Sequence, residues 1–314
     1  MDREIWAVTM ATIRKAARAV KEPGREPTFP NWLIVAMELW RVWHNQSLSW
    51  ACDPSHYHGL FRPRKRTKDG RRLPSISRFS RRVKSEAVQA ILRRVDDALS
   101  GRGIKANAGM LRYVDGKPLT VSPVSKDPDA ARGHVSGGFA KGYKLHAFIT
   151  EDRRIEVWSV MPLNVAEQSV AMAMLPYLTP AQAGRIGGGL SLGDSNYDSA
   201  PLHKGLWSHC GDRLLTPLKA QNRVGEAGHH PVTLRQMGQQ RREAVEVWRE
   251  HPDLARYVLK KRNNAESVFS AMTVACGLSL PGFVRRLERV RRWVGAKIIL
   301  YHARLLAQQH AAAA

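Results

Sequence analysis

Three acidic residues stand where carboxylates would be useful for chemistry on phosphodiesters. Asp115 follows the apolar run LRYV, and Asp194 follows LSLG. Glu266 is the only carboxylate between Leu254 and Cys276. In-line cleavage or transfer of a phosphodiester is accelerated by two divalent cations about 4 Å apart, which stabilise the attacking and leaving oxygens. Mg²⁺ prefers carboxylate and water oxygens, so these three side chains are candidate metal ligands.

Each of the three acids also has an ordinary structural interpretation. Asp115 precedes Gly116, and an Asp-Gly pair is typical of a turn. Asp194 precedes Ser-Asn-Tyr and is well placed to cap a following helix. Glu266 lies one helical turn after Arg262, so an ion pair between them would account for its charge. Taken one at a time, the acids leave both interpretations open.

The charge of the whole chain favours an anionic partner. Its 314 residues include 50 Lys and Arg against 27 Asp and Glu, which gives a formal charge of +23. Such an excess promotes contact with nucleic acid, because each neutralised phosphate releases counterions. An anionic membrane surface is the second candidate, but no apolar run reaches about 18 residues and the N-terminus lacks a signal-peptide core. We therefore expect a cytoplasmic, nucleoid-associated protein without membrane contact.

The first hundred residues predict a small helical domain. NWLIVAMELWRVWHN has apolar residues at helical spacing, and the segment from Ser77 to Ser100 is predicted as one helix capped by Ser75 or Ser77. Residues 61–105 carry 15 Lys and Arg against 4 Asp and Glu. We assign residues 1–105 to a helical, basic DNA-binding domain.

The pattern changes near Met110 to a mixed α/β sequence. LRYVDGKPLTVS predicts a hairpin that turns at Asp-Gly-Lys-Pro, and YKLHAFIT and RIEVWSVMP predict a second hairpin across EDR. Helix, strand, helix, strand and helix follow, with a mainly helical insertion at about 220–252. The last two helices are predicted at about 254–276 and 283–309. Three antiparallel strands plus parallel strands, flanked by helices, are expected for residues 106–310.

These segments resemble the DDE transposases of bacterial insertion sequences, whose catalytic core is an RNase H-like fold. VDGKPLTVSPVSKDPDAARG with KGYKLHAFIT resembles the block around the first aspartate of that family, and LGDSNYDS resembles the second. RNNAESVFSAM with RRLERVRRWVGAKIILYH resembles the glutamate block. Tyr257, Arg262 and Glu266 resemble a Tyr-Arg-Glu motif, with four residues between Tyr257 and Arg262 where the common form has two. The resemblance covers roughly Leu111 to Leu306.

The resemblance implies an insertion-sequence transposase. Asp115, Asp194 and Glu266 would be the catalytic triad and would bind two Mg²⁺ or Mn²⁺ ions per active site. The implied reaction is cleavage at the terminal inverted repeats of a transposable element, followed by attack of the 3′-OH on target DNA during DNA transposition and recombination. The implied partners are double-stranded DNA and a second copy of the chain, as a homodimer in a synaptic complex.

Basic residues in three places are candidate DNA contacts. The helix Ser77–Ser100 would either enter a major groove and contact bases or only clamp the backbone. Arg262 would hold a phosphate or orient Glu266, and the C-terminal helix would follow phosphates without base choice. Lys141, Lys144 and His146 would contact phosphates or belong to a solvated strand face. The candidate contacts are Arg78, Arg81, Arg82, Lys84, Lys141, Lys144, Arg262, Arg285, Arg286, Arg289 and Arg292.

Two further groups of residues have simpler interpretations. Cys52, His56 and His58 have the spacing of a zinc half-site, but no second ligand pair lies at a suitable distance, so a plain loop is favoured. Four tryptophans, at positions 32, 40, 43 and 50, would stack on bases or, at helical spacing, pack in the core.

Two functions compete with an active transposase. One is a non-enzymatic, sequence-specific DNA-binding protein derived from a transposase, which would bind without metal-dependent chemistry. The other is a different RNase H-like nuclease, such as a junction resolvase, which would prefer branched DNA and join no strands. Inverted repeats and a duplicated target sequence beside the gene would favour the transposase.

Overall fold

The chain forms two compact units. The computed structural model describes residues 2–20, 27–57, 70, 73–100, 111–179, 188–217 and 237–313. One unit comprises residues 1–106, 272–284 and 292–314, and the other comprises 107–271 and 285–291. Residues 272–284 and 292–310 were assigned from the sequence to the second domain, but in the structure they cluster with the N-terminal helices.

The first unit is built from helices around aromatic side chains. Its N-terminal elements are α1 (Arg3–Arg18), α2 (Asn31–Trp43), α3 (Leu48–Ala51), the 3₁₀ turn η1 (Pro54–His56), α4 (Ile76–Val83) and α5 (Glu86–Ser100). Helix α2 is buried along most of its length, from Leu33 to Val42. The rings of Trp6 and Trp40 lie 4.9 Å apart between α1 and α2. Apart from the Glu38–Arg41 ion pair, the buried residues of α2 are apolar, as expected for a helix at the centre of such a bundle.

The basic segment from Ser77 to Ser100 is two helices, so the prediction of a single helix was wrong. Helix α4 ends at Val83 and α5 begins at Glu86. The N–H groups of Lys84 and Ser85 bond to carbonyls three residues back, which tightens the last turn of α4. The Ser85 hydroxyl also donates to the Arg82 carbonyl. Short polar side chains of this kind compete with the helical backbone and favour a break. The expected cap at Ser75 is confirmed, since its Oγ accepts from the Arg78 N–H.

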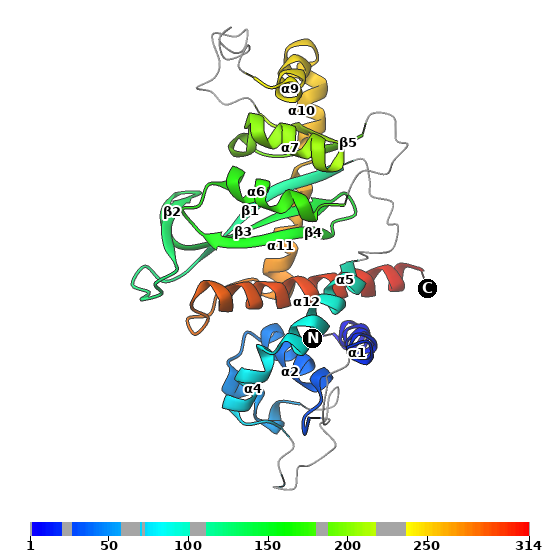
Figure 1. Cartoon of the computed structure of the whole chain (residues 1–314), viewed down its shortest axis with the longest axis vertical. Coiled ribbons are helices and arrows are strands. Elements are labelled where there is room, and N and C mark those ends of the chain that lie inside the picture. The colour runs from blue at the N-terminus through cyan, green and yellow to red at the C-terminus, as the bar shows by residue number, and fades with distance from the viewer. Residues whose placement is uncertain are drawn as a thin grey trace. The chain divides into compact units, whose positions relative to one another are not determined.

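The second unit contains a mixed sheet. Its strands are β1 (Leu111–Thr120), β2 (Ala131–Val135), β3 (Gly138–Thr150), β4 (Ile155–Pro162), β5 (Gly189–Leu192) and β6 (Asp212–Leu215). The order is β2-β3-β1-β5-β6, with β4 also paired to β3. The pairs β1–β3, β2–β3 and β3–β4 are antiparallel, and β1–β5 and β5–β6 are parallel. The predicted mixed sheet is confirmed at this level, and Figure 1 shows β2 at one edge of it.

The predicted turn at Asp115-Gly116 was wrong, because β1 runs straight through it. The strand pairs with β3 from Arg112 to Thr120, so Asp115 and Gly116 lie in mid-strand. Strand β5 pairs with β1 only at Leu111–Tyr113. At position 118 the β5 side of β1 is therefore not paired with β5, and a proline, which lacks an N–H, is tolerated there. Strand β2 was not predicted at all. The hairpin across EDR is confirmed by the β3–β4 pairing.

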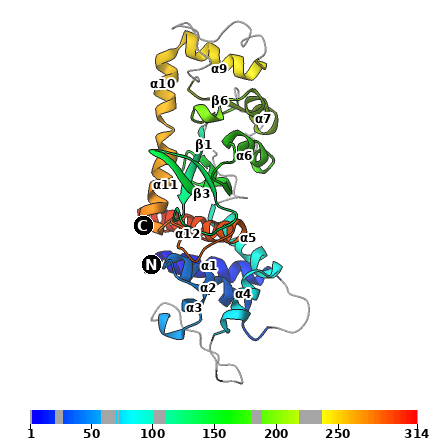
Figure 2. The ribbon, with the colours of Figure 1, turned by 90° about the vertical axis from the view of Figure 1, so that its left-hand side faces the viewer.

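Helices cover both faces of the sheet. Helices α6 (Glu167–Met174) and α7 (Ala200–Cys210), with the turns η2 (Leu175–Tyr177) and η3 (Ser195–Tyr197), pack on one face. Side chains from β1, β3 and β4, including Val114, Phe148 and Val157, form the core with these helices. Helix α11 (Asn263–Cys276) lies on the opposite side of the strands from α6 and α7 (Figure 2). Strand β1 therefore has helices on both of its faces.

The C-terminal half is more segmented than the sequence predicts. The segment 254–276, predicted as one helix, forms α10 (Pro252–Lys260) and α11, separated at Lys261–Arg262. The last helix, α12 (Leu287–Ala313), begins four residues later than predicted. The predicted insertion at about 220–252 contains α9 (Gln239–Glu250), and its residues up to 236 lie outside the described residues.

Candidate active site

Asp115 and Asp194 lie at the same level of two neighbouring segments, with Asp115 in the middle of β1 and Asp194 just after the end of β5. The parallel register of β1 and β5 matches Tyr113 with Leu192. Asp115 is two residues beyond Tyr113, and Asp194 is two residues beyond Leu192, so the chain brings the two aspartates to the same level. Adjacent strands are about 4.8 Å apart, which places the two residues within reach of a common ligand.

Glu266, in the first turn of α11, is linked to Asp115 through Arg262. The Arg262 guanidinium lies 3.4 Å from Asp115 Oδ2 and 3.0 Å from Glu266 Oε1. A second contact holds the start of α11 to β1, because Asn264 Nδ2 donates to the Tyr113 hydroxyl at 3.0 Å. The predicted ion pair between Glu266 and Arg262 is therefore present. The Glu266 side chain remains 59% exposed and is open to solvent.

The two aspartates are poorly stabilised as anions. The pKa of Asp115 is raised to about 6, chiefly by burial and also by the nearby carboxylates of Asp194 and Glu167, although the Gly116 N–H and Arg262 lower it. Burial, followed by Glu167, also raises the pKa of Asp194. Asp194 accepts a hydrogen bond from the Asn196 N–H at 2.7 Å, so the predicted capping role is present as well. Close carboxylates that repel one another are typical of sites that bind cations or protons.

A buried ion pair beside the aspartates was missed from the sequence. Lys144 Nζ lies 2.5 Å from Glu167 Oε1, and both side chains are largely buried. A Cβ on Gly116 would lie 2.9 Å from Lys144 Cδ and 3.5 Å from the Tyr197 hydroxyl, so both side chains pass close to the strand next to Asp115. Nothing in the local sequence around Glu167 distinguishes it from an ordinary first-turn helix acid, since its partner is 23 residues away.

The segment after Asp194 is fixed by a second buried carboxylate. Asp198 accepts two 2.8 Å hydrogen bonds from Arg241 on α9, from Nε and Nη2. The imidazole of His203 lies 3.5 Å from the same carboxylate. Although burial raises the pKa of Asp198, the bonds from His203 and Arg241 bring it well below its usual value. This contact anchors the turn η3 immediately after Asp194.

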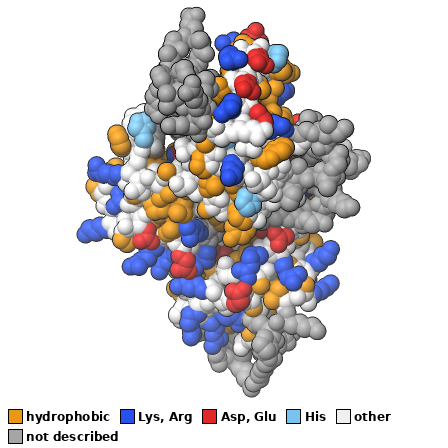
Figure 3. Space-filling view, turned by 45° about the horizontal axis from the view of Figure 1, so that its top comes forward, with side chains coloured by type: hydrophobic (Ala, Val, Ile, Leu, Met, Phe, Trp, Pro, Cys, Tyr) orange, Lys and Arg blue, Asp and Glu red, His pale blue; other side chains and the backbone are white. Residues whose placement is uncertain are grey.

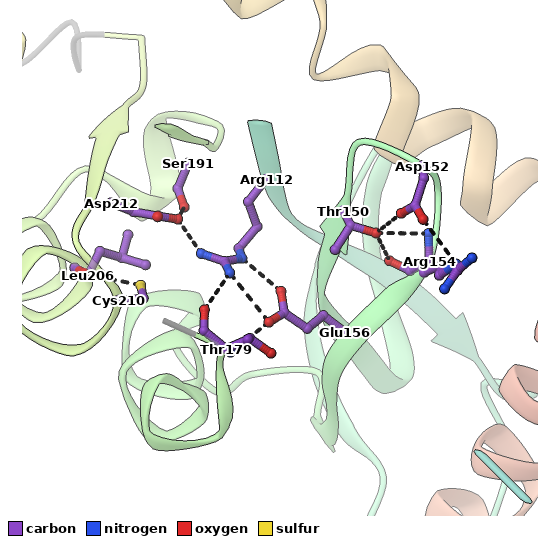
Figure 4. Close-up of polar contacts among 10 residues, drawn as sticks. All are labelled: Arg112, Thr150, Asp152, Arg154, Glu156, Thr179, Ser191, Leu206, Cys210 and Asp212. Carbon is purple, nitrogen blue, oxygen red and sulfur yellow. Dashed lines mark hydrogen bonds and ion pairs between the residues drawn. The ribbon is translucent and has the colours of Figure 1, made fainter. Parts of the chain in front are cut away.

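A different arginine cluster lies three residues before Asp115 on β1 (Figure 4). Arg112 pairs with Glu156 of β4 at 2.8 Å and with Asp212 of β6. Arg112 Nη2 also donates to the Thr179 carbonyl at 2.9 Å. The Ser191 hydroxyl donates to Asp212 at 2.7 Å, which completes the pairing on that side. All three charged side chains are buried.

The residues at Asp115 fit a divalent cation with two protein carboxylates. Mg²⁺ is commonly held by one or two carboxylates, with water and substrate phosphates completing its shell. Asp115 and Asp194 provide such a pair of oxygen ligands. Among the residues that the structure describes, no group of three or more His, Cys, Asp or Glu is placed to hold a metal ion. The arrangement therefore has two adjacent candidate ligands, with Glu266 held in an ion pair.

The predicted DNA contacts on β3 have different surroundings. Lys141 is half-buried, and its Nζ donates to the Ser125 carbonyl at 2.7 Å. Lys144 is engaged by Glu167. Neither prediction for His146 holds, because it is fully buried, and burial lowers its pKa to about 4. Around His146 the strand is covered on both faces, so this part of β3 has no solvated side.

The predicted contacts in the first unit lie on and just after α4. Arg78, Arg81 and Lys84 are exposed, while Arg82 donates to Asn31 of α2. Phe79 and Val83 are buried and hold α4 to the unit. An α-helix with its side chains is about 10–12 Å across, which suits the width of a major groove.

The arginines at the start of α12 lie in a segment fixed by carboxylates. The Arg286 N–H donates to both oxygens of Asp127, and the Leu287 N–H donates to Asp129 at 2.9 Å. Arg285, Arg286 and Arg289 are exposed, and Arg292 is half-buried. Figure 3 shows Lys and Arg side chains spread over much of one face, among hydrophobic and acidic ones.

Among the cysteine, histidine and tryptophan candidates, His56 and Trp40 pack against aromatic neighbours, and Trp32, Trp43 and Trp50 are half-buried. His56 stacks on Trp50 at 4.2 Å, and its Nδ1 contacts the Trp50 carbonyl. His58 lies outside the described residues. Trp40 is buried among Trp6, His44 and Tyr57, which supports its core interpretation. Among the described helices, none is long and apolar enough to cross a bilayer.

No family model matches the sequence, and no curated protein matches it either. A cryo-EM structure of a piggyBac transposase synaptic complex with hairpin DNA shows a weak similarity. The TM-score is 0.43 at 10% sequence identity, and the alignment covers 100% of this chain and 74% of that one.

Proposed function

We propose that the chain is a DNA strand-cleaving and strand-joining enzyme of the DDE transposase type, acting at the terminal repeats of an insertion sequence. The observation that carries the proposal is the convergence of distant acids: Arg262 contacts both Asp115, 147 residues away, and Glu266. Asp194 follows the neighbouring strand β5 by two residues, at the level of Asp115. Ordered acidic blocks thus meet at one end of a mixed sheet, which supports an RNase H-like arrangement.

In this proposal Asp115 and Asp194 hold divalent cations, Mg²⁺ or Mn²⁺, and Glu266 joins them when its ion pair with Arg262 opens. The cations, two per site, supply Lewis-acid stabilisation of the phosphate when bound. Arg262 neutralises the carboxylates in their absence and would contact a phosphate oxygen of the DNA. The Lys144–Glu167 pair orients the strand next to Asp115.

DNA binding and pairing of two copies belong to the same proposal. The net charge of +23 supports binding to double-stranded DNA at the element ends and at the target. The exposed basic residues of α4 would bind the element ends, and those before and within α12 would follow the backbone. A homodimer would hold two ends together in a synaptic complex.

The test uses DNA fragments that span both flanks of the gene for this chain, incubated with the full-length protein and Mg²⁺ or Mn²⁺. We expect cation-dependent cleavage and joining of strands. Asp115→Asn, Asp194→Asn and Glu266→Gln should each lower the rate by at least about 100-fold, because electrostatic stabilisation of the transition state is lost. Asp253→Asn and Glu250→Gln, at exposed positions of α10 and α9, are matched controls. Undiminished cleavage by the three site variants would contradict the proposal.

A second candidate is a DNA-binding protein without catalysis. It is favoured by the engagement of Glu266 with Arg262 and by the lack of a three-residue metal group among the described residues. It predicts specific binding of the same fragments with no cleavage under either cation. Cleavage that prefers branched DNA and yields no joined strands would instead indicate another nuclease of this fold.

A further inference from the structure

One face of the β2–β3 hairpin carries two cations and two rings in a ladder. Cross-strand register pairs Arg132 with Lys141 and His134 with Phe139. Residues two apart on a strand share a face, so all four side chains lie on the same side. The rings of His134 and Phe139 meet edge to face, with centroids 5.3 Å apart.

The opposite face of the hairpin is closed by the protein, so the ladder faces solvent. A Cβ on Gly133 would lie 2.5 Å from the Leu163 carbonyl oxygen, which shows how tightly that face is packed. Arg132 and His134 are exposed, and the Phe139 side chain is 79% exposed. At the turn, Gly137 and Gly138 have positive φ and open space around them. The hairpin thus presents a large ring at its end without covering it.

The carboxylates in the loop next to this face already accept hydrogen bonds from other groups. Among the described residues, neither Arg132 nor Lys141 forms an ion pair with a carboxylate, and Lys141 donates to a backbone carbonyl. In the adjoining loop, Asp127 accepts from the Tyr143 hydroxyl and the Arg286 N–H. Asp129 is bound to the Leu287 N–H. The face therefore keeps its positive charge.

We propose that this face binds an unpaired nucleotide, with a base stacked on Phe139 and the flanking phosphates held by Arg132 and Lys141. Aromatic rings beside cations are the combination with which proteins bind single-stranded nucleic acid, because every base offers a flat face whatever the sequence. An intact duplex hides those faces in its own stack, so the ligand class is DNA with an unpaired base. The inference rests on the proposed DNA-processing function and adds a site outside the carboxylates.

The test measures affinity for two labelled duplexes of equal length, one fully paired and one with two unpaired bases at its centre. Phe139→Ala should weaken binding of the unpaired duplex about 5- to 150-fold, the range for stacking one base on a ring, and leave the paired duplex within about twofold. Phe139→Trp should restore affinity. A 2-aminopurine at the unpaired position should report stacking through its fluorescence in the wild type but not in Phe139→Ala.

Matched variants separate stacking from general effects. Tyr177→Ala removes another highly exposed ring, outside the hairpin, and should leave both affinities unchanged. Arg132→Ala should lower the slope of log affinity against log salt concentration by about one, since one phosphate contact is lost. Circular dichroism and melting temperature verify that each variant folds.

The outcomes distinguish the two proposals. Equal loss of affinity for both duplexes, or no loss, in Phe139→Ala would overturn the stacking site while leaving metal-dependent cleavage untouched. Failure of the wild-type chain to bind any DNA would overturn the proposed function as well. Hairpin-dependent binding to phosphatidylserine vesicles, with no preference for unpaired DNA, would assign the face to a membrane surface and overturn the inference.

Discussion

Arg112 belongs to strand β1 and Arg262 contacts it, and each arginine bridges a pair of carboxylates in a different way. Arg112 lies between Glu156 and Asp212, with all three side chains buried and further bonds to Thr179 and Ser191. Arg262 lies between Asp115 and Glu266 at 3.4 and 3.0 Å, with Glu266 mostly in solvent. One cluster is closed and satisfied, and the other is loose and partly open.

We interpret the Arg112 cluster as structural and the Arg262 cluster as part of the functional site. Burial lowers the pKa of Arg112, but the two carboxylates outweigh it and the pKa is raised overall, so the charge is secure. At the other end, burial raises the pKa of Asp115 and Asp194, so their charge is poorly compensated. Groups that are left unsatisfied by the fold are expected where a ligand completes the arrangement.

The largest predicted effect is on the closed cluster. Arg112→Met should lower the free energy of unfolding by about 3–5 kcal/mol, because two buried carboxylates lose their cation. Arg262→Met should cost under about 1 kcal/mol, since its pairs are partly exposed. Urea unfolding of both variants measures the contrast. Equal losses would contradict the division of the two clusters into structural and functional.

The Arg241–Asp198 contact should behave like the closed cluster and depend on pH. The pKa of Asp198 is lower in the folded chain than in the unfolded chain, where an aspartate titrates near pH 3.9. Its stabilisation, about 1.5–3 kcal/mol for hydrogen bonds to a charged group, is therefore complete above about pH 4 and lost as the pH falls further.

Urea unfolding of the wild type and Asp198→Asn between pH 2.5 and 7 tests this expectation. The stability difference between them should shrink as the pH is lowered. A difference that stays constant over the whole range would show that the charge of Asp198 does not stabilise the fold.

A smaller effect is expected at the contact that holds α11 to β1. Asn264→Ala removes the hydrogen bond to the Tyr113 hydroxyl and should cost about 0.5–1.5 kcal/mol in unfolding. DNA cleavage should fall more than this loss implies, because Arg262 and Glu266 are on the same turn. Thermal unfolding and cleavage rates measured together separate the two. A proportionate fall in both would assign Asn264 to stability alone.

The smallest effect on stability is expected at the open site itself. Asp194→Asn keeps the oxygen that accepts from the Asn196 N–H, since asparagine caps helices as well as aspartate does. It also removes a charge whose pKa is raised, so at pH 7 stability should be unchanged or higher by up to about 1 kcal/mol. Denaturant unfolding checks the sign. A clear loss of stability would place Asp194 with the structural carboxylates.

The sequence predicted some features around Asp115 and missed others. The order of the acidic blocks, the mixed sheet and the Arg262–Glu266 pair follow from local patterns and a family resemblance. The turn at Asp115-Gly116 was wrong because pairing with β3 overrides the local preference of Asp-Gly. Strand β3 pairs with β1 from Arg112 to Thr120, and this long pairing keeps residues 115 and 116 extended.

Other features depend on contacts between distant residues and leave no local pattern. Strand β2 includes Gly133, a weak strand former whose lack of a side chain is needed only because Leu163 packs on it. The Lys144–Glu167 pair requires the strand and the helix to be placed together. The break between α4 and α5 is marked only by Ser85, which equally well occurs on helix surfaces.

Mn²⁺ binding, followed by electron paramagnetic resonance, tests most directly whether Asp115 and Asp194 form the working site. Four chains are compared: wild type, Asp115→Asn, Asp194→Asn and Asp212→Asn. We expect saturable binding by the wild type and by Asp212→Asn, and affinity at least about tenfold weaker in the other two, as for loss of a group that supports a metal site. Equal Mn²⁺ binding by all four chains would contradict the assignment.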